Sequence, residues 1–331
     1  MSFRPVLGLA LGAMAVLHGC AAAPRAPATA LAEAGIKATG TFSAEVREME
    51  AQLSGAEVGE AFVATLRRCS NASIKCREVP ESEAVKSERE KLADVVGLRA
   101  RALDALGAAY AALQTEAAYD QGADLSGAAG DAVKAANAFA AEAAKLDNGA
   151  TPSAVPATIA SLADFGFGLL GEQLQRKRIL AASRQIAQAT LLIRNGMVDE
   201  AASFGRLSRF LIGERTAARM TLMKSGFLAR DDVMKEVAQQ LNLNLTPPGN
   251  VSDAAYEMAL QASLRELSRQ EVVAAQDRYQ AGIAALGALL QSHAALEKGK
   301  AFSIADVDRF LTRLDATLAD APPPPPPPSG Q

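Results

Sequence analysis

The chain has 331 residues and a net charge of −3, with 34 lysines and arginines against 37 aspartates and glutamates. This balance argues against a nucleic-acid-binding protein, which normally carries a strongly basic domain. Almost half of the residues are hydrophobic (49%), but only 5% are aromatic and none is tryptophan. Much of the apolar content is therefore alanine, which favours helices over strands. The length allows one large domain or two modest ones.

The first 19 residues have the zones of a secretory signal peptide. One basic residue, Arg4, precedes an apolar run from Val6 to Leu17, and the small residue Gly19 follows. The run is shorter than the roughly 20 residues that a membrane-spanning helix needs. Leu17-His18-Gly19-Cys20 resembles the lipobox of bacterial lipoproteins, in which an aliphatic residue, a tolerant position and a small residue precede an invariant cysteine.

This resemblance implies that the chain is cleaved before Cys20 and that lipid on Cys20 anchors it to the cell envelope, facing the periplasm. Several acyl chains are expected there, because one chain alone gives only marginal, reversible membrane binding. Ala21 after the cysteine favours the outer over the inner membrane. An ordinary signal peptide followed by an unrelated cysteine is the alternative interpretation.

Composition divides the rest of the chain into three parts. Residues 20–40 are small, include two prolines and are expected to form a spacer, and residues 41–320 are expected to form a helical bundle domain. The tail, residues 321–331, holds seven consecutive prolines, which favour a stiff polyproline helix about 22 Å long. We interpret this tail as a solvated terminus, with a ligand for an aromatic groove as the alternative.

Two further cysteines, Cys69 and Cys76, flank a short polar stretch. An oxidising periplasm would permit a disulfide between them. Such a bridge would stabilise the fold by roughly 2–3 kcal/mol on the chain-entropy estimate. Free or metal-bound thiols are the alternatives, and we favour the disulfide because no other cysteine or histidine lies nearby in the mature sequence.

Helical periodicity runs through most of the proposed bundle domain. The expected helices cover residues 43–69, 82–120, 127–147, 156–192, 198–224, 230–241, 252–298 and 304–320. Asn195-Gly196 and Pro247-Pro248-Gly249 are the breakers expected to end two of them. The helix at 252–298 would be about 65–70 Å long, whereas a compact globule of this size is roughly 40 Å across. The sequence therefore predicts an all-α, elongated antiparallel bundle of long helices.

The helix at 82–120 has the clearest apolar seam, with alternating spacings of four and three residues typical of a coiled coil. The seam comprises Leu92, Val96, Arg99, Leu103, Leu106, Tyr110, Leu113 and Ala117. Arg99 is its one interruption.

Few residues suggest chemistry. His293 lies on an apolar stripe and is interpreted as a half-buried core or interface histidine, with Glu297 placed to pair with it. Residues 166–171 spell the dinucleotide-binding glycine pattern but lack the surrounding strand and helix that it requires. We interpret these glycines as a helix break or a close helix contact, and we expect no cofactor and no metal.

Basic residues gather at 176–178 and along Arg206, Arg209, Arg215 and Arg219, with acidic residues between them. We interpret them as a solvated face with local ion pairs. Contact with anionic lipid or cell-wall polymer is the alternative.

Three functions are compatible with these features. The leading hypothesis is a non-enzymatic envelope lipoprotein whose helical bundle serves as a scaffold or interaction module, with an envelope protein or further copies of the chain as partners. The second is a periplasmic binding module that holds a lipid or small apolar ligand between its helices. The third is an enzyme that uses carboxylates alone, but the sequence nominates no catalytic pair, so we expect no enzyme.

Overall fold

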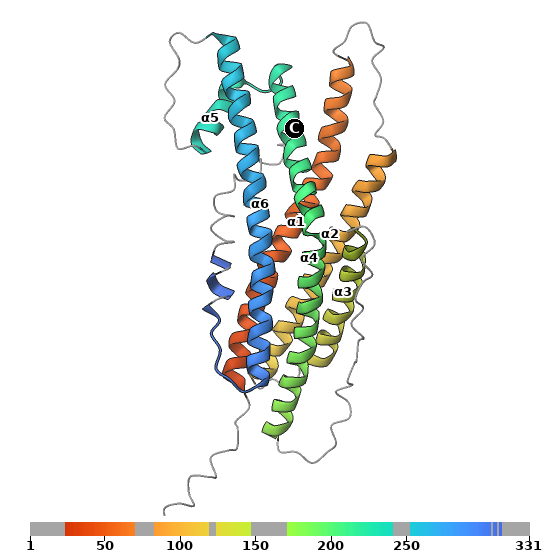
Figure 1. Cartoon of the computed structure of the whole chain (residues 1–331), viewed down its shortest axis with the longest axis vertical. Helices are drawn as coiled ribbons and strands as arrows, with labels where there is room; N and C mark the ends of the chain where they lie inside the picture. Colours follow the sequence, from red (N-terminus) through yellow and green to blue (C-terminus); the bar gives the residue numbers. More distant parts are fainter. Residues whose placement is uncertain are drawn as a thin grey trace, which may run out of the picture.

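The computed structural model describes residues 24–69, 83–118, 124–146, 171–240, 252–305, 307–309 and 311–312. This part of the chain is an elongated bundle of helices without strands (Figure 1), which confirms the predicted all-α class. Its principal helices are α1 (Arg25–Cys69), α2 (Glu83–Ala117), α3 (Leu125–Leu146), α4 (Gly171–Lys224), α5 (Arg230–Gln240) and α6 (Asp253–Glu297). With 54 residues, α4 is about 81 Å long.

Helices α1 and α2 are antiparallel, and so are α4 and α6. Ser43 of α1 donates a hydrogen bond to Asp104 of α2, while Gly35, two turns earlier, lies against Tyr110. In α4 and α6, Arg184 pairs with Glu297 and Arg215 pairs with Glu271. Helices α3 and α4, by contrast, run in the same direction (Figure 1). The predicted antiparallel order therefore holds for the pairs α1–α2 and α4–α6 but not for α3 and α4.

The bundle has two ends, which we name after residues located there. At the Arg25 end, α1 begins beside the start of α4, and Arg25 donates a hydrogen bond to Gln175 there. Helix α6 ends at the same end of the bundle. At the Phe227 end, α4 passes through a short turn into α5, and α6 begins. A small second core at this end joins α4, α5 and α6 through Met223, Val233, Val237, Leu260 and Leu264.

The predicted spacer at residues 20–40 is wrong for residues 25–40, which form the first four turns of α1. Pro27 suggested a spacer, but it is the third helical residue, and the first amide groups of a helix have no partner within it. The first backbone bond runs from the Ala28 amide to the Pro24 carbonyl (3.0 Å). Ala28 and Leu31 are fully buried, so this segment belongs to the core.

The predicted break at Asn195-Gly196 is also wrong, because α4 continues through both residues. Gly196 faces α3 so closely that an added Cβ would lie 2.7 Å from the ring carbon Cε1 of Phe139. Phe139 is fully buried. The glycine therefore admits the aromatic ring instead of ending the helix.

The seam of α2 is confirmed as the buried face. Seven of its eight residues are buried and Leu92 is half-buried. The start of α6 is confirmed as well, because the Ser252 side chain accepts from the Ala255 amide as an N-cap. Val307 and Leu311 of the final predicted helix are helical and fully buried.

Several predictions lie outside the described residues and stay predictions. They concern the signal peptide with Cys20, residues 166–170 of the glycine pattern, the breaker at 247–249, residues 313–320 of the last helix and the tail 321–331.

Candidate functional site

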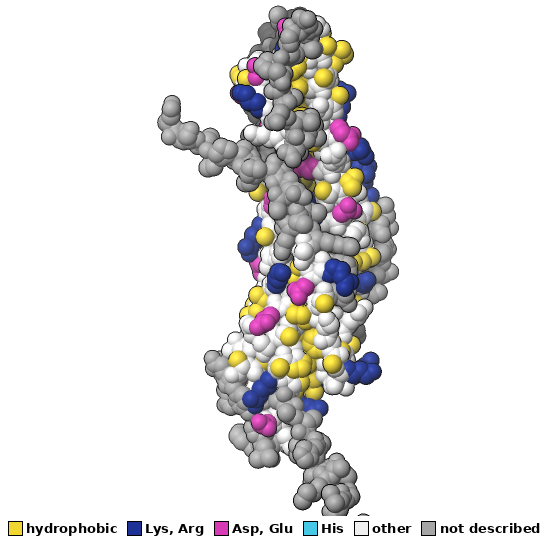
Figure 2. Space-filling view, turned by 90° about the vertical axis from the view of Figure 1, so that its left-hand side faces the viewer, with side chains coloured by type: hydrophobic (Ala, Val, Ile, Leu, Met, Phe, Trp, Pro, Cys, Tyr) yellow, Lys and Arg dark blue, Asp and Glu magenta, His cyan; other side chains and the backbone are white. Residues whose placement is uncertain are grey.

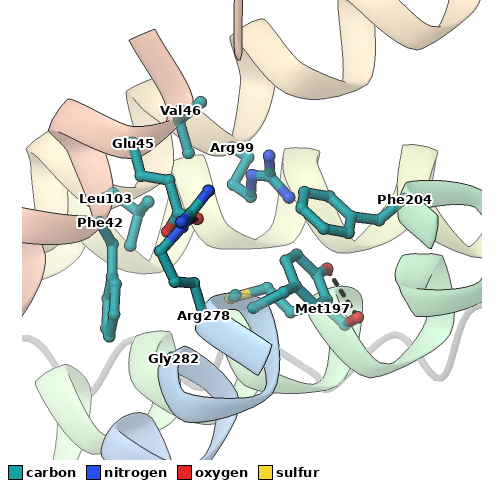
Figure 3. A pocket seen from close by; sticks show the side chains of 10 residues that line it. Phe42, Glu45, Val46, Arg99, Leu103, Met197, Phe204, Arg278 and Gly282 are labelled. Atoms are coloured by element: carbon teal, nitrogen blue, oxygen red, sulfur yellow. Dashed lines mark hydrogen bonds and ion pairs between the residues drawn. The ribbon is translucent and has the colours of Figure 1, made fainter. Parts of the chain in front are cut away.

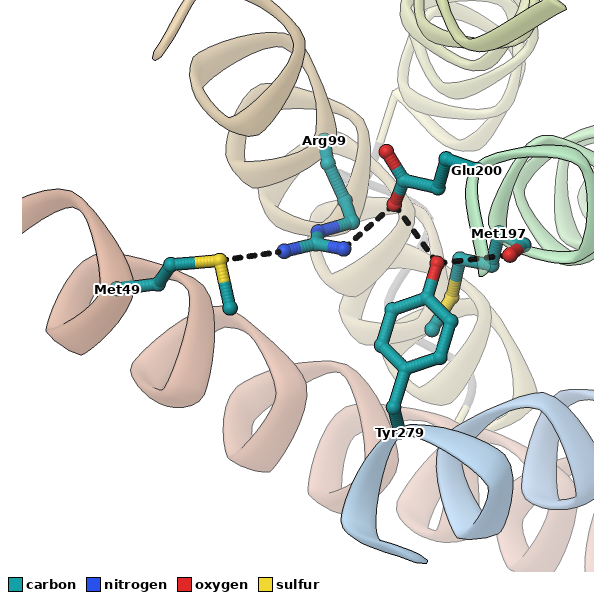
Figure 4. Close-up of polar contacts among 5 residues, drawn as sticks. All are labelled: Met49, Arg99, Met197, Glu200 and Tyr279. Carbon is teal, nitrogen blue, oxygen red and sulfur yellow. Dashed lines mark hydrogen bonds and ion pairs between the residues drawn. The ribbon is translucent and has the colours of Figure 1, made fainter. Parts of the chain in front are cut away.

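A layer of charged side chains crosses the core partway along the bundle (Figure 4). Arg99 of α2 is only 2% exposed, and its Nη1 donates to Oε1 of Glu200 on α4 at 2.5 Å. The Tyr279 hydroxyl of α6 lies 2.8 Å from the same Glu200 oxygen and 2.8 Å from the Met197 carbonyl. Three helices are thus joined through one buried carboxylate.

Two stacked aromatic rings lie beside the Arg99 guanidinium. Its central carbon lies 5.6 Å from the ring centre of Phe204 and 5.5 Å from that of Tyr279, and these two rings stack at 3.9 Å. Both distances are within the range of cation–π attraction. On the α1 side, Nη2 of Arg99 donates to the Met49 sulfur at 3.6 Å. The guanidinium is therefore surrounded by one carboxylate, two aromatic rings and a sulfur.

A second ion pair closes this layer at the contact between α1 and α6. Arg278 lies 3.6 Å from Glu45, and their side chains are 15% and 16% exposed. Behind them is a small hollow that leaves about 10 Å³ for the centre of a water-sized occupant, and its polar lining comes from Glu45, Arg99, Arg278 and Tyr279 (Figure 3). A second hollow of the same small size has both Arg99 and Leu146 in its lining. We call these five residues, Glu45, Arg99, Glu200, Arg278 and Tyr279, the charged layer.

Burial and charge act against each other in the charged layer. Burial raises the pKa of Glu200, although Arg99 and the hydrogen bond from Tyr279 oppose the rise. Burial likewise raises the pKa of Glu45, opposed by Arg278 and Arg99. Burial is the largest single influence on the pKa of Arg99 and lowers it, but the attraction and hydrogen bond of Glu200 together with the attraction of Tyr279 and Glu45 raise this pKa overall. Arg99 is therefore the fixed cation, and the two carboxyls are the groups that can change charge.

His293 lies in a second buried layer nearer the Arg25 end. Its ring is fully buried, with Nε2 2.9 Å from the Tyr110 hydroxyl and Nδ1 2.8 Å from the Ser183 hydroxyl. The Tyr110 hydroxyl also lies 3.4 Å from that of Thr190. Burial lowers the pKa of His293 to about 3, so the ring is neutral at pH 7. We call these four residues the histidine layer.

The histidine layer corrects two parts of the prediction for His293. The ring does lie on the apolar face of α6, but it is completely buried rather than half-buried. Glu297 pairs with Arg184 of α4 at 3.4 Å instead of with the ring. Full burial denies a substrate access to the neighbouring Ser183 hydroxyl, so this serine and histidine serve the core.

Basic residues of α4 form ion pairs, as predicted, but the partners of Arg215 and Arg219 lie on other helices instead of among the neighbouring acidic residues. Arg215 pairs with Glu271 of α6, and Arg219 pairs with Glu236 of α5. Arg206 donates to the Ser203 hydroxyl on its own helix at 2.7 Å. Figure 2 shows basic and acidic side chains interspersed along the face that it displays, rather than gathered in separate patches.

The other site residues from the sequence are placed only in part. Cys69 is the last residue of α1, while Cys76 lies outside the described residues, so their disulfide stays a prediction. Gly171, the last glycine of the dinucleotide-like pattern, is the first residue of α4. Among the residues that the structure describes, no group of three or more histidine, cysteine or acidic side chains is placed to hold a metal ion.

Sequence reasoning found one member of the charged layer and missed its partners. Arg99 was visible as the interruption of an apolar seam, and it is the residue around which the layer is built. Glu200 and Tyr279 are 101 and 180 positions away from it in the chain. Nothing local distinguishes Glu200 from the many surface glutamates, so a single sequence could not reveal the pair.

No helix in the described part of the chain is both long and apolar enough to span a membrane. Comparison of the chain with protein-family models, with curated proteins and with solved structures found no match.

Proposed function

We propose that the protein is a lipid-anchored envelope lipoprotein whose helical bundle acts as a non-enzymatic scaffold. The observation that carries this proposal is the lipobox-like run Leu17-His18-Gly19-Cys20 behind a short apolar stretch. Lipid on Cys20 would hold the chain at an envelope membrane, facing the periplasm, because several acyl chains together bind a bilayer stably.

The position of α1 supports a rod that stands away from the membrane. Arg25, only five residues after Cys20, begins α1 at one end of the bundle, and α1 then runs toward the opposite end. An anchor at Cys20 therefore acts on the Arg25 end. Because α4 is about 81 Å long, the Phe227 end would be held far from the anchored end.

The use of the buried polar groups supports a scaffold rather than a catalyst. Arg99, Glu200 and Tyr279 bind one another, and His293 binds Tyr110 and Ser183. These contacts connect helices that are distant in sequence, which is what a rigid spacer requires. Each hollow beside Arg99 leaves only about 10 Å³ for the centre of a water-sized occupant, far less than the typical 300–1,000 Å³ pocket of a small-molecule site, so the lipid-carrier alternative gains no support from them.

The anchor is tested by expressing the full chain and a Cys20→Ser variant in a bacterial host. We expect the parent to fractionate with membranes and to carry an acyl-modified amino-terminal Cys20 by mass spectrometry. The variant should lose both properties. The matched control is the double variant Cys69→Ser/Cys76→Ser, which should stay anchored. A parent protein that is soluble and begins at another residue would refute the proposal.

The scaffold role is tested by photo-crosslinking in intact cells. Probes replace exposed residues along the rod, such as Leu191 and Val273 in its body and Phe227 at its far end. A scaffold should give the same crosslinked protein from neighbouring positions and at similar yield in repeated experiments. Anchored protein that yields no specific partner at any position would contradict this role while leaving the anchor intact.

A further inference from the structure

The hydrogen-bond donors of Arg99 exceed the acceptors around them. A guanidinium carries five N–H donors. Nη1 reaches Glu200, Nη2 reaches the weak acceptor sulfur of Met49, and the buried Nε has no hydrogen-bond partner. A buried donor without an acceptor destabilises the folded state. The site therefore has an unmet demand for a small hydrogen-bond acceptor.

Space for such an acceptor lies beside Arg99. The hollow behind Glu45 and Arg278 is lined by Arg99, Arg278 and Tyr279 together with apolar side chains such as Phe42 and Leu103, and it leaves about 10 Å³ for the centre of a water-sized occupant (Figure 3). Glu45 and Arg278 are the charged lining residues whose side chains are partly exposed to solvent. An ion from solvent would therefore reach the hollow past this ion pair. The hollow suits an occupant of the size of a water molecule or a single ion.

The charge of the hollow depends on Glu45. The charged groups that act on Glu45 are Arg278 of α6, Arg99 of α2 and Glu48 of α1, and Glu200 of α4 pairs with Arg99. Glu200 accepts from both Arg99 and Tyr279 at short distances, whereas Glu45 has a long contact of 3.6 Å to Arg278. Burial raises the pKa of Glu45, so this carboxyl takes up a proton more readily than an exposed glutamate.

We propose that the hollow beside Arg99 binds one halide-sized anion, and that binding is coupled to protonation of Glu45. With Glu45 ionised, the charged layer holds two arginines and two carboxylates and is neutral, while Glu48 is exposed to solvent outside it. Uptake of one proton by Glu45 leaves one excess positive charge, which one bound anion neutralises. The anion also accepts the hydrogen bond that Arg99 Nε otherwise lacks. This inference does not depend on the proposed envelope function.

The proposal is tested by thermal unfolding of the purified full chain in bromide against gluconate at equal ionic strength. Gluconate is too large for the hollow. At about pH 5 bromide should raise Tm by about 2 °C or more, the shift expected for a ligand near ten times its Kd. At about pH 7.5, above the usual glutamate range, the shift should shrink. Glu45→Gln, which imitates the protonated carboxyl, should show the bromide shift at both pH values.

Glu33→Gln is the matched control, because Glu33 is exposed on the same helix and contacts Gln114 instead of the charged layer. It should behave like the parent. Crystals grown in bromide near pH 5 should show anomalous density within hydrogen-bonding distance of Arg99 Nε. Equal Tm values in both salts at both pH values, or a water molecule in place of bromide at that position, would overturn the proposal.

Discussion

The charged layer and the histidine layer lie in the same bundle and both draw on α2, α4 and α6, with α1 adding Glu45 to the charged layer, yet they satisfy buried polar groups differently. The charged layer keeps full charges and needs partners of opposite sign, as Arg99 and Glu200 show. The histidine layer keeps its titratable group neutral and needs only hydroxyl groups, from Tyr110 and Ser183. Removing a partner residue should destabilise the charged layer, whereas protonation of His293 should destabilise the histidine layer.

The difference has a physical cause in the number of hydrogen-bond groups. A neutral imidazole has one donor and one acceptor, and two hydroxyl groups can satisfy both. A guanidinium has five donors, which the surrounding apolar core cannot match. The histidine layer is therefore closed, whereas the charged layer keeps a buried donor without a partner and adjoining hollows.

Breaking the buried ion pair should have the largest effect. Glu200→Leu leaves the Arg99 cation unpaired in the core, and we expect a loss of about 3–5 kcal/mol in the free energy of unfolding. The double variant Arg99→Met/Glu200→Leu should recover most of this loss, because no charge then stays buried. Denaturant unfolding of both variants measures the difference. A double variant as unstable as the single one would mean that packing, not charge, dominates.

Lowering the pH should weaken the histidine layer. The unfolded chain binds a proton on His293 below about pH 6.5, while the folded chain resists protonation down to about pH 3. The contribution of neutral His293 to stability is therefore fully present above the unfolded pKa of about 6.5. It is lost as the pH falls toward the folded pKa of about 3. At pH 5 the loss should be about 2 kcal/mol, at about 1.4 kcal/mol per pKa unit.

The variant His293→Gln isolates this contribution. Its stability should depend less on pH between 7 and 5 than that of the parent, because the other groups still titrate in both proteins. Chemical unfolding at a series of pH values gives the two slopes. Equal slopes would show that His293 is protonated in the folded chain.

Crowding the histidine layer should have a moderate effect. An added Cβ at Gly35 of α1 would lie 2.4 Å from the Tyr110 ring, so Gly35→Ala must displace Tyr110 from His293. We expect a loss of about 1–3 kcal/mol, as for other overpacked cores. Gly40→Ala on the same helix is the control, since an added Cβ there meets no atom within 4 Å. That control should gain up to about 1 kcal/mol from helix propensity, and thermal unfolding compares the two variants.

Removing an exposed ion pair should have the smallest effect. Arg47 and Asp104 join α1 to α2 at 2.9 Å, but both side chains are about half exposed or more. Arg47→Gln should cost less than about 1 kcal/mol, because water screens the attraction. Urea unfolding at low and high salt measures it. A cost comparable to that of Glu200→Leu would remove the distinction between buried and exposed pairs.

Helix positions were predictable where the apolar pattern was regular. The seam of α2 and the capped start of α6 at Ser252 follow from the sequence, because both depend on residues within one or two turns. The start of α1 was not predictable in this way. Pro27 and the small residues around it resemble a linker, and only packing of Ala28 and Leu31 into the core makes that segment helical.

By itself, the sequence determined that the protein is built from long helices with alanine-rich faces, because composition and periodicity are local properties. Tertiary structure alone decided that α4 continues through Gly196, where the ring of Phe139 fills the space beside the glycine. It also decided that Arg99 meets Glu200 and that His293 meets Tyr110. These partners lie 101 and 183 positions apart. Their pairing depends on how whole helices align, which no local pattern encodes.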